Sequence, residues 1–243
     1  MLVSAAVCPH PPVLVPEMAG EAAPELDALR AACDEAVRRL RGADAVIVVG
    51  GGPETRSYGP DAYATLTPFG LDWTSPEGEP TDGAEPLPLS LTIGNWLLER
   101  QGPDVAAPRN QAEPRYQAVG FDAEPEACMA LGRDLAETAD RVALLVMGDG
   151  SACRSEKAPG YLDLRARPYD EGVARGLGNA DAAALAALDP GLSRDVQAGG
   201  RAAWQVLAGA AGDTADLTGE LLADEAPYGV GYFAAAWSRT GRS

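Results

Sequence analysis

Three short, largely apolar segments constrain the fold of this chain more than any other feature of its sequence. They are residues 2–7 (LVSAAV), 45–49 (AVIVV) and 142–147 (VALLVM). Segments of this length without charged residues are typical of strands that are buried on both faces of a sheet. Between the first two, residues 22–41 carry apolar side chains at helical spacing. This order predicts a βαβ unit whose two strands are parallel.

Strand-like and helix-like segments alternate through the rest of the chain, without an internal repeat or a clear linker. The alternation predicts an α/β fold in one domain, residues 1–243, with a central, mostly parallel sheet flanked by helices on both faces. We expect helices at 89–101, 124–139, 162–178, 181–188 and 200–211, strands at 115–120 and 228–237, short extended pieces at 62–66 and 69–73, and a proline-rich connection at 102–114.

Charge and composition exclude several classes of protein. The 243 residues include 36 acidic and 19 basic ones, which gives a formal charge of −17. Binding to nucleic acid or to an anionic membrane surface requires clustered lysine and arginine, so we expect neither partner. No apolar run approaches the roughly 20 residues of a membrane span. The four cysteines form no CxxC pair and the first residues do not resemble a secretion signal, so we expect reduced thiols and a cytoplasmic protein.

Chemically versatile residues follow each of the three apolar segments. The segments run into the loops 8–12, 50–54 and 148–154. Ligands of open α/β sheets bind beyond the carboxyl ends of the strands, so we expect these loops to meet at one edge. His10 is the only histidine and stands between two prolines. It is a candidate metal ligand or acid/base, and the alternative is a structural histidine that forms a hydrogen bond in its loop.

The other two loops supply further candidates. Gly51 and Gly52 allow a ligand close to the backbone, although a tight strand exit explains the same glycines. Asp149 is a candidate metal ligand or base, or a cap for its turn. Ser151 has no second histidine to activate it, which excludes a serine hydrolase. Arg154 is close enough in the sequence to lower the pKa of the Cys153 thiol, and the alternative is a buried, inert thiol.

The ordered set of loops resembles the class III extradiol ring-cleavage dioxygenases. The similarity is to the catalytic B-subunit type of protocatechuate 4,5-dioxygenase and its relatives, including the Memo proteins. It rests on Pro-His-Pro around His10, the glycines after the second strand and Gly-Asp-x-Ser at 148–151; residues 198–208 and 228–237 are similar to later family segments. The resemblance implies a B-subunit-like fold, a homo-oligomer, and ferrous iron held by two histidines and a glutamate beside an acid/base histidine.

The chain departs from this pattern at three of the four expected positions. Pro53 stands where the second histidine is expected, Ala152 and Cys153 stand at the place of the acid/base histidine, and no ligand lies near Gly199. The resemblance with these departures implies a degenerate metal site. We therefore expect a protein that binds a small aromatic or other small molecule, or that acts as a non-catalytic subunit.

Three alternatives to this function remain. Two of them place a metal at the same edge of the sheet, and in the third no ligand binds. The first is an active metal-dependent oxidoreductase of the ring-cleavage type, with Glu54 and Asp149 recruited around His10. The second is an iron or zinc site made by Cys8, His10 and Cys153, because Cys8 and His10 are two residues apart at a strand end. The third is a structural or interaction protein with a filled pocket. We expect no bound cofactor, with iron or zinc as the alternative.

Overall fold

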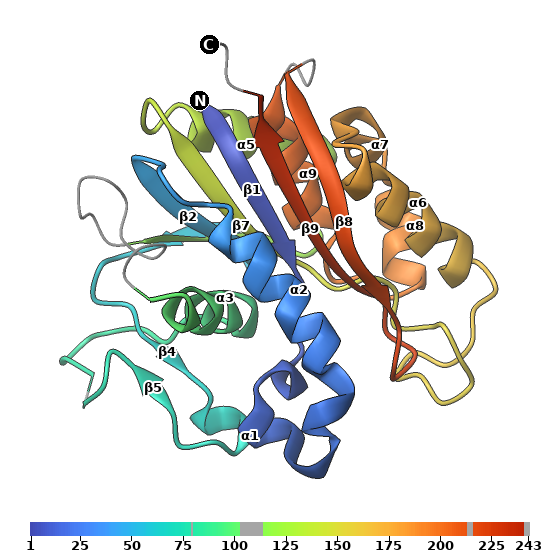
Figure 1. Cartoon of the computed structure of the whole chain (residues 1–243), viewed down its shortest axis with the longest axis horizontal. Coiled ribbons are helices and arrows are strands. Elements are labelled where there is room, and N and C mark those ends of the chain that lie inside the picture. The colour runs from blue at the N-terminus through green and yellow to red at the C-terminus, as the bar shows by residue number, and fades with distance from the viewer. Residues whose placement is uncertain (79, 103–113, 213–215, 241–243) are drawn as a thin grey trace.

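A computed structural model of the chain describes residues 1–78, 80–102, 114–212 and 216–240. A large central sheet is flanked by helices, with α2 and α3 in front of it and α5 and α9 behind it (Figure 1). Most of the expected proline-rich connection, residues 103–113, lies outside the described residues. Within the described part of the chain, no helix is long and apolar enough to cross a membrane.

The large sheet has seven strands in the order β3-β6-β2-β7-β1-β9-β8. Its four central strands, β6, β2, β7 and β1, are parallel, and the three expected apolar strands lie side by side among them. The strands are β1 (Leu2–Cys8), β2 (Ala45–Gly52), β3 (Arg56–Tyr58), β6 (Arg115–Gly120), β7 (Val142–Met147), β8 (Leu217–Glu225) and β9 (Tyr232–Arg239), and a separate pair is formed by β4 (Ala64–Thr65) and β5 (Thr74–Ser75).

The sheet is mixed, and the expectation of a mostly parallel sheet is wrong. Strand β3 is antiparallel to β6, β9 is antiparallel to β1, and β8 is antiparallel to β9. The antiparallel pairs come from the hairpin β8–β9, of which the sequence predicts only the second strand, and from β3, which the sequence does not predict. Strand β8 is an edge strand with the sequence LTGELLADE, and most of its residues are partly exposed. An edge strand needs no continuous apolar run, so its sequence does not stand out.

Helices cover both faces of the sheet, as the sequence predicts. The helix expected at 22–41 is shorter, because the turns before it are a 3-10 helix that contains Pro24, a residue without a backbone N–H. The helices are α1 (Pro16–Ala19), α2 (Asp27–Arg38), α3 (Leu89–Arg100), α5 (Pro125–Ala136), α6 (Ala166–Gly178), α7 (Ala182–Ala186), α8 (Pro190–Asp195) and α9 (Arg201–Ala211).

Two hydrophobic layers hold these helices on the sheet. One contains α2 and α3, with Leu29 and Leu91 fully buried, and the other contains α5, α6 and α9, with Trp204 fully buried. Helices α5 and α9 approach each other closely through glycines: a Cβ atom on Gly132 would lie 2.0 Å from the Val206 carbonyl oxygen. Alternate residues of each strand face different layers.

Candidate functional site

The carboxyl ends of three central strands bring the candidate loops to one edge of the sheet. Strands β2, β7 and β1 are adjacent and parallel, with Met147 in register with both Cys8 and Gly50. The backbone N–H of Gly148 donates to the Cys8 carbonyl over 2.9 Å, which joins the first loop to the third. Loops that are far apart in the sequence therefore meet because their strands are adjacent and parallel, as the three apolar segments predict.

His10 and Asp149 form the polar centre of this edge. The His10 backbone N–H donates to Asp149 Oδ1 over 2.8 Å, and His10 Nδ1 lies 3.6 Å from the same oxygen. His10 is 9% exposed, and its Nδ1 atom is buried without a hydrogen-bond partner among the described residues. A buried polar atom without a partner is costly, so this ring nitrogen marks a position at which a ligand atom would be stabilising.

Glycines make the wall that faces this histidine. An ideal Cβ atom on Gly199 would lie 3.9 Å from His10 Cε1, and the Gly200 N–H donates to the Asp149 carbonyl over 2.8 Å. A Cβ on Gly148 would lie 2.6 Å from the Gly200 Cα, so only glycine allows the two loops to approach this closely. The sequence segment that resembles a late family motif thus packs directly against His10.

A hollow of about 300 Å³ adjoins this wall through Gly199. Its other lining residues include Phe121, half exposed, and Arg201, 3% exposed. The Arg201 guanidinium donates to the carbonyl oxygens of Phe121 and Ala123 over 2.6 Å and 2.5 Å. These carbonyls hold the cation in place without neutralising it. The hollow therefore combines an aromatic ring, a fixed positive charge and the exposed ion pair between Asp122 and Arg194 (2.7 Å).

The glycines of the second loop position the aromatic ring of this hollow. A Cβ atom on Gly51 would lie 2.4 Å from Phe121 Cε1, so the ring rests directly on the Gly51 backbone. Gly52 is a tight exit beside Ala118 rather than a wall of the hollow. Gly51 therefore contributes to the candidate site by leaving room for Phe121.

Two groups beside the loops were not identified from the sequence. Tyr232 begins β9, and burial together with the nearby Asp149 charge raises the pKa of its phenol. Asp170 on α6 is 1% exposed and accepts hydrogen bonds from the Ser151 backbone N–H (2.8 Å), the Ser151 hydroxyl (2.7 Å) and Arg154 Nη1 (2.8 Å). Ser151 and Arg154 are therefore structural partners of Asp170. A lone aspartate inside a helical pattern carries no sequence signal for such a role.

The two candidate cysteines lie on different faces of the sheet. Cys8 packs in the layer of α2, where burial, followed by the contact with Cys33, raises the pKa of its thiol well above the usual value. Cys153 packs in the opposite layer, and its Sγ donates to the Gly160 carbonyl over 3.4 Å. The structure thus does not bring Cys8, His10 and Cys153 together. Strand β1 ends at Cys8, so the alternation that would align Cys8 with His10 does not continue past Pro9.

For Cys153 the structure favours the buried, inert thiol over a thiol activated by Arg154. Burial raises the pKa of the Cys153 thiol, and the carboxylates of Asp163 and Asp170 add to this effect. Arg154 does not lower it, because its guanidinium is paired with Asp170. The thiol is therefore protonated at neutral pH and is a poor nucleophile.

The raised thiol pKa values predict slow chemical labelling. We expect native protein at about pH 8 to react slowly with Ellman's reagent, because burial keeps Cys8, Cys128 and Cys153 protonated and inaccessible. Raising the pH increases the rate, since the raised pKa values move thiolate formation upward. Protein unfolded in guanidinium provides the control, in which all four thiols react. A Cys153→Ser variant identifies the thiol responsible if the native protein reacts rapidly, which would contradict this account.

Of the two carboxylates proposed as recruited ligands, Asp149 lies beside His10 and Glu54 does not. Glu54 is exposed and forms an ion pair with Arg56 over 3.5 Å. Across residues 1–78, 80–102, 114–212 and 216–240, no three histidine, cysteine, aspartate or glutamate side chains are grouped as a metal ion requires. The structure pairs His10 with Asp149 and places Glu54 outside that pair.

The iron centre implied by the family resemblance does not fit the residues of this edge. A ferrous site of that kind needs two imidazoles and a carboxylate on one face of the ion. Pro53 and Ala152 have no side-chain donor, and Asp149 Oδ1 already accepts the His10 backbone N–H. The donor set therefore supports hydrogen bonding by His10 rather than ligation of iron.

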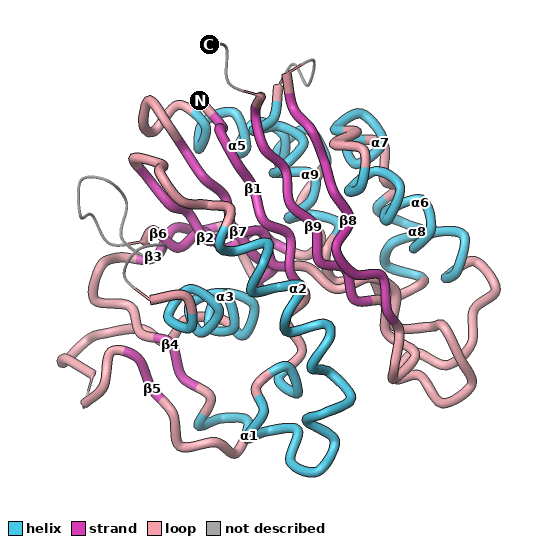
Figure 2. Tube along the Cα trace, viewed as in Figure 1, coloured by secondary structure: helices cyan, strands magenta, loops and turns pink. Residues whose placement is uncertain are grey.

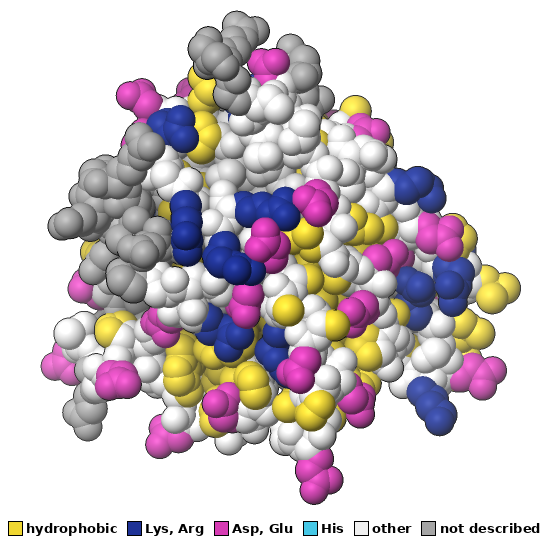
Figure 3. Space-filling model, viewed as in Figure 1, with side chains coloured by type: hydrophobic (Ala, Val, Ile, Leu, Met, Phe, Trp, Pro, Cys, Tyr) yellow, Lys and Arg dark blue, Asp and Glu magenta, His cyan; other side chains and the backbone are white. Residues whose placement is uncertain are grey.

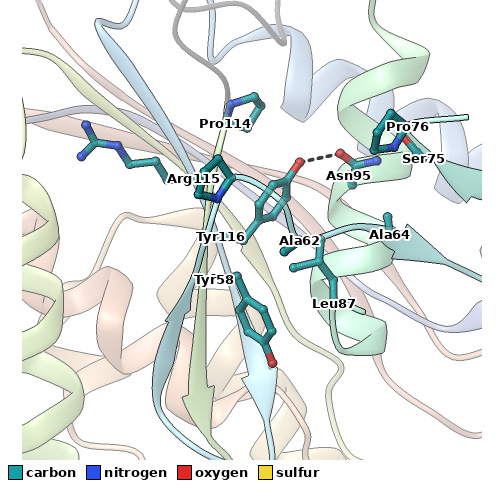
Figure 4. Close-up of a pocket in the computed structure, with 12 residues that line it drawn as sticks. Tyr58, Ala62, Ala64, Ser75, Pro76, Leu87, Asn95, Pro114, Arg115 and Tyr116 are labelled. Carbon is teal, nitrogen blue, oxygen red and sulfur yellow. Dashed lines mark hydrogen bonds between the residues drawn. The ribbon is translucent and has the colours of Figure 1, made fainter. Parts of the chain in front are cut away.

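A second hollow, of about 450 Å³, lies away from these loops near the amino end of β6 (Figure 4). Tyr58 and Tyr116, which are in register on β3 and β6, form one side of it, and Leu87 and Asn95 form another. The Tyr116 hydroxyl donates to Asn95 Oδ1 over 2.5 Å. None of the residues singled out from the sequence lines this hollow.

Comparison with known proteins supports the fold. No protein-family model matches the sequence, and no curated protein matches it. Solved structures do match, among them the crystal structure of the uncharacterized protein JW3007 from Escherichia coli K12. The similarity covers 97% of this chain and 99% of that chain, with a TM-score of 0.60 and 16% sequence identity. At this identity the likeness concerns the fold alone, and it extends over the whole architecture described above.

Proposed function

We propose that this protein binds a small organic molecule, aromatic and negatively charged, beside His10 at the carboxyl edge of the sheet. The observation that carries the proposal is the buried Nδ1 atom of His10 beside a wall of glycine. This atom lies 3.6 Å from Asp149 Oδ1 and has no hydrogen-bond partner among the described residues. We further propose that the protein is a divergent relative of the extradiol dioxygenase B-subunits whose metal site is degenerate. In that role it binds its ligand without ring cleavage, either alone or as a non-catalytic subunit.

The neighbouring hollow supports this choice of ligand. Its volume of about 300 Å³ is at the lower end of the range for small-molecule sites, which favours a molecule with a single ring. Phe121 offers an aromatic face, and Arg201 offers a buried cation that attracts a carboxylate. The overall charge of −17 opposes anions at long range, so selectivity for a carboxylate depends on this local cation.

The experiment measures binding and oxygen consumption in the same preparation. Titration with benzoate, catechol and 3,4-dihydroxybenzoate, followed by calorimetry, is expected to show saturable binding that is strongest for the carboxylates. The His10→Ala variant is expected to weaken this binding about tenfold, which corresponds to the loss of roughly 1.4 kcal/mol. Gly199→Leu fills the wall of the hollow and is expected to abolish binding. With ferrous iron added, no ligand-dependent oxygen uptake is expected.

A glycine in open space provides the matched control. Gly172→Leu introduces the same side chain on α6, where the nearest atom to a Cβ is 4.0 Å away, and it is expected to leave binding unchanged. Failure of every aromatic ligand to bind would overturn the proposal. Iron-dependent oxygen uptake that is lost in His10→Ala would instead support the active oxidoreductase, and elemental analysis of untagged protein would identify its metal.

We also propose a homo-oligomer in the cytoplasm. The free thiols of all four cysteines support a reducing compartment. The loop before α6 exposes Tyr161, Leu162 and Leu164, the last of which is 83% exposed. Exposed apolar side chains grouped in this way are typical of contact surfaces between proteins.

A further inference from the structure

A hollow of about 400 Å³ beside the ion pair of Arg154 and Asp170 is lined by basic side chains. Arg154, Lys157 and Arg167 line it, and Lys157 is the only lysine in the chain. Three of the 19 basic residues thus meet in one concavity of a protein that carries 36 acidic ones. Basic side chains also gather over α6 and the loops beside it, on the right of the face shown in Figure 3.

Loops that are far apart in the sequence form the walls of this hollow. The long loop between β7 and α6, pink in Figure 2, contributes Arg154, Ser155 and Lys157, and the turn between β8 and β9 contributes residues 226–229. The Arg154 backbone N–H donates to the Gly229 carbonyl over 3.0 Å, and the Gly231 N–H donates to the Ser151 carbonyl over 2.8 Å. The concavity is therefore fixed by backbone hydrogen bonds between the two loops.

Arg154 is held in one orientation at the base of this hollow. Its side chain is 14% exposed, and Nη1 donates to Asp170 Oδ2 over 2.8 Å. Its Nε atom is buried without a hydrogen-bond partner among the described residues. One nitrogen of this guanidinium is thus held by Asp170, and another lacks a hydrogen-bond acceptor. Such a group is suited to donate a hydrogen bond to an oxygen atom of a ligand.

Lys157 and Arg167 differ from Arg154 in their charged partners. In the part of the chain that the structure describes, Lys157 and Arg167 form no ion pair within 4.0 Å. Burial raises the pKa of Asp224 on β8, and the nearby cations Arg154 and Arg167 act in the opposite direction. The hydroxyl of Tyr228, which also lines the hollow, donates to Glu25 over 3.2 Å. Of the three basic side chains of the hollow, only Arg154 is therefore held in a described ion pair.

We infer that this hollow binds the phosphate group of a small phosphorylated molecule. A phosphate monoester carries about −1.5 to −2 charges at neutral pH and three acceptor oxygens. Lys157 and Arg167 match that charge, the Arg154 fork offers directed donors, and Ser155 adds a hydroxyl to the lining. The site does not include His10, so it is separate from the proposed aromatic site.

The test uses inorganic phosphate as the probe for the full chain. At a constant ionic strength of about 0.15 M, calorimetry is expected to detect saturable phosphate binding, with a weaker response to acetate. Lys157→Gln and Arg167→Gln are both changes at exposed positions, and each is expected to weaken binding about tenfold. Arg175→Gln is the matched control, since it removes the same charge from exposed α6 surface outside the hollow.

Two outcomes would overturn the inference. One is the absence of saturable binding in the unaltered protein. The other is an equal loss of phosphate affinity in Arg175→Gln, which would mean that binding depends only on the net charge of the surface. The His10→Ala variant is expected to bind phosphate normally, so failure of the aromatic-site proposal and failure of this inference give different results.

Discussion

Replacing Asp170 by alanine is expected to lower the free energy of unfolding by about 3–5 kcal/mol, because it leaves a charge and polar groups buried without their partner. Asp170 is 1% exposed and holds the Ser151 backbone, the Ser151 hydroxyl and the Arg154 guanidinium at once. For a chain of this size, each kcal/mol corresponds to roughly 2–4 °C in the melting temperature. Calorimetric melting is therefore expected to show a decrease of about 10 °C.

An exposed ion pair on the same side of the molecule provides the control. Asp195 pairs with Arg165 over 2.9 Å, and both side chains are 55% exposed. Asp195→Ala is expected to cost less than about 1 kcal/mol, as exposed ion pairs do. Adding Arg154→Met to Asp170→Ala is expected to recover part of the loss, since the uncompensated cation is then gone. Equal melting temperatures for Asp170→Ala and Asp195→Ala would contradict the structural role of Asp170.

Replacing Gly132 by alanine is expected to destabilise the fold by about 3 kcal/mol or more, since overpacking a contact between backbones forces two helices apart. The added Cβ would lie 2.0 Å from the Val206 carbonyl oxygen and 2.7 Å from the Ala210 nitrogen. Backbone atoms of α9 cannot move aside as a flexible side chain could. The higher helix propensity of alanine contributes only about 1 kcal/mol in the opposite direction. Denaturant unfolding measures the net effect.

Gly172→Ala makes the same substitution in a helix that has room for it. The nearest atom to a Cβ at Gly172 is 4.0 Å away, so this variant is expected to gain about 0.5–1 kcal/mol from helix propensity alone. The two alanine variants therefore shift stability in opposite directions. A similar gain in Gly132→Ala would show that α5 and α9 do not approach as closely as described.

The central strands could be predicted from the sequence, and the rest of the sheet could not. Strands β1, β2 and β7 are buried on both faces, so their sequences are apolar without interruption. Strand β8 is an edge strand with acidic residues, and it resembles a loop in sequence. Neither β8 nor the short strand β3 at the opposite edge is predicted, and this hid the antiparallel pairs of the sheet.

Part of the candidate site could be predicted from the sequence, because strand order decides which loops meet at the edge of the sheet. Strand order brought His10 beside Asp149, and the late glycine segment packs against them through Gly199. Which face a side chain occupies was harder to predict, and Cys8 and Cys153 are on opposite faces. Asp170 was missed because its role depends on partners in a distant loop rather than on its own neighbours.

The position of β1 between β7 and β9 has a consequence for folding. One side of β1 is covered only when β9, residues 232–239, has joined the sheet. Until then β1 presents an unpaired edge, which is prone to pair with other chains. Pairing of segments so distant in sequence is also slow, because a long loop must close first. Folding intermediates in which β9 has not yet docked therefore expose the β1 edge and are prone to aggregate.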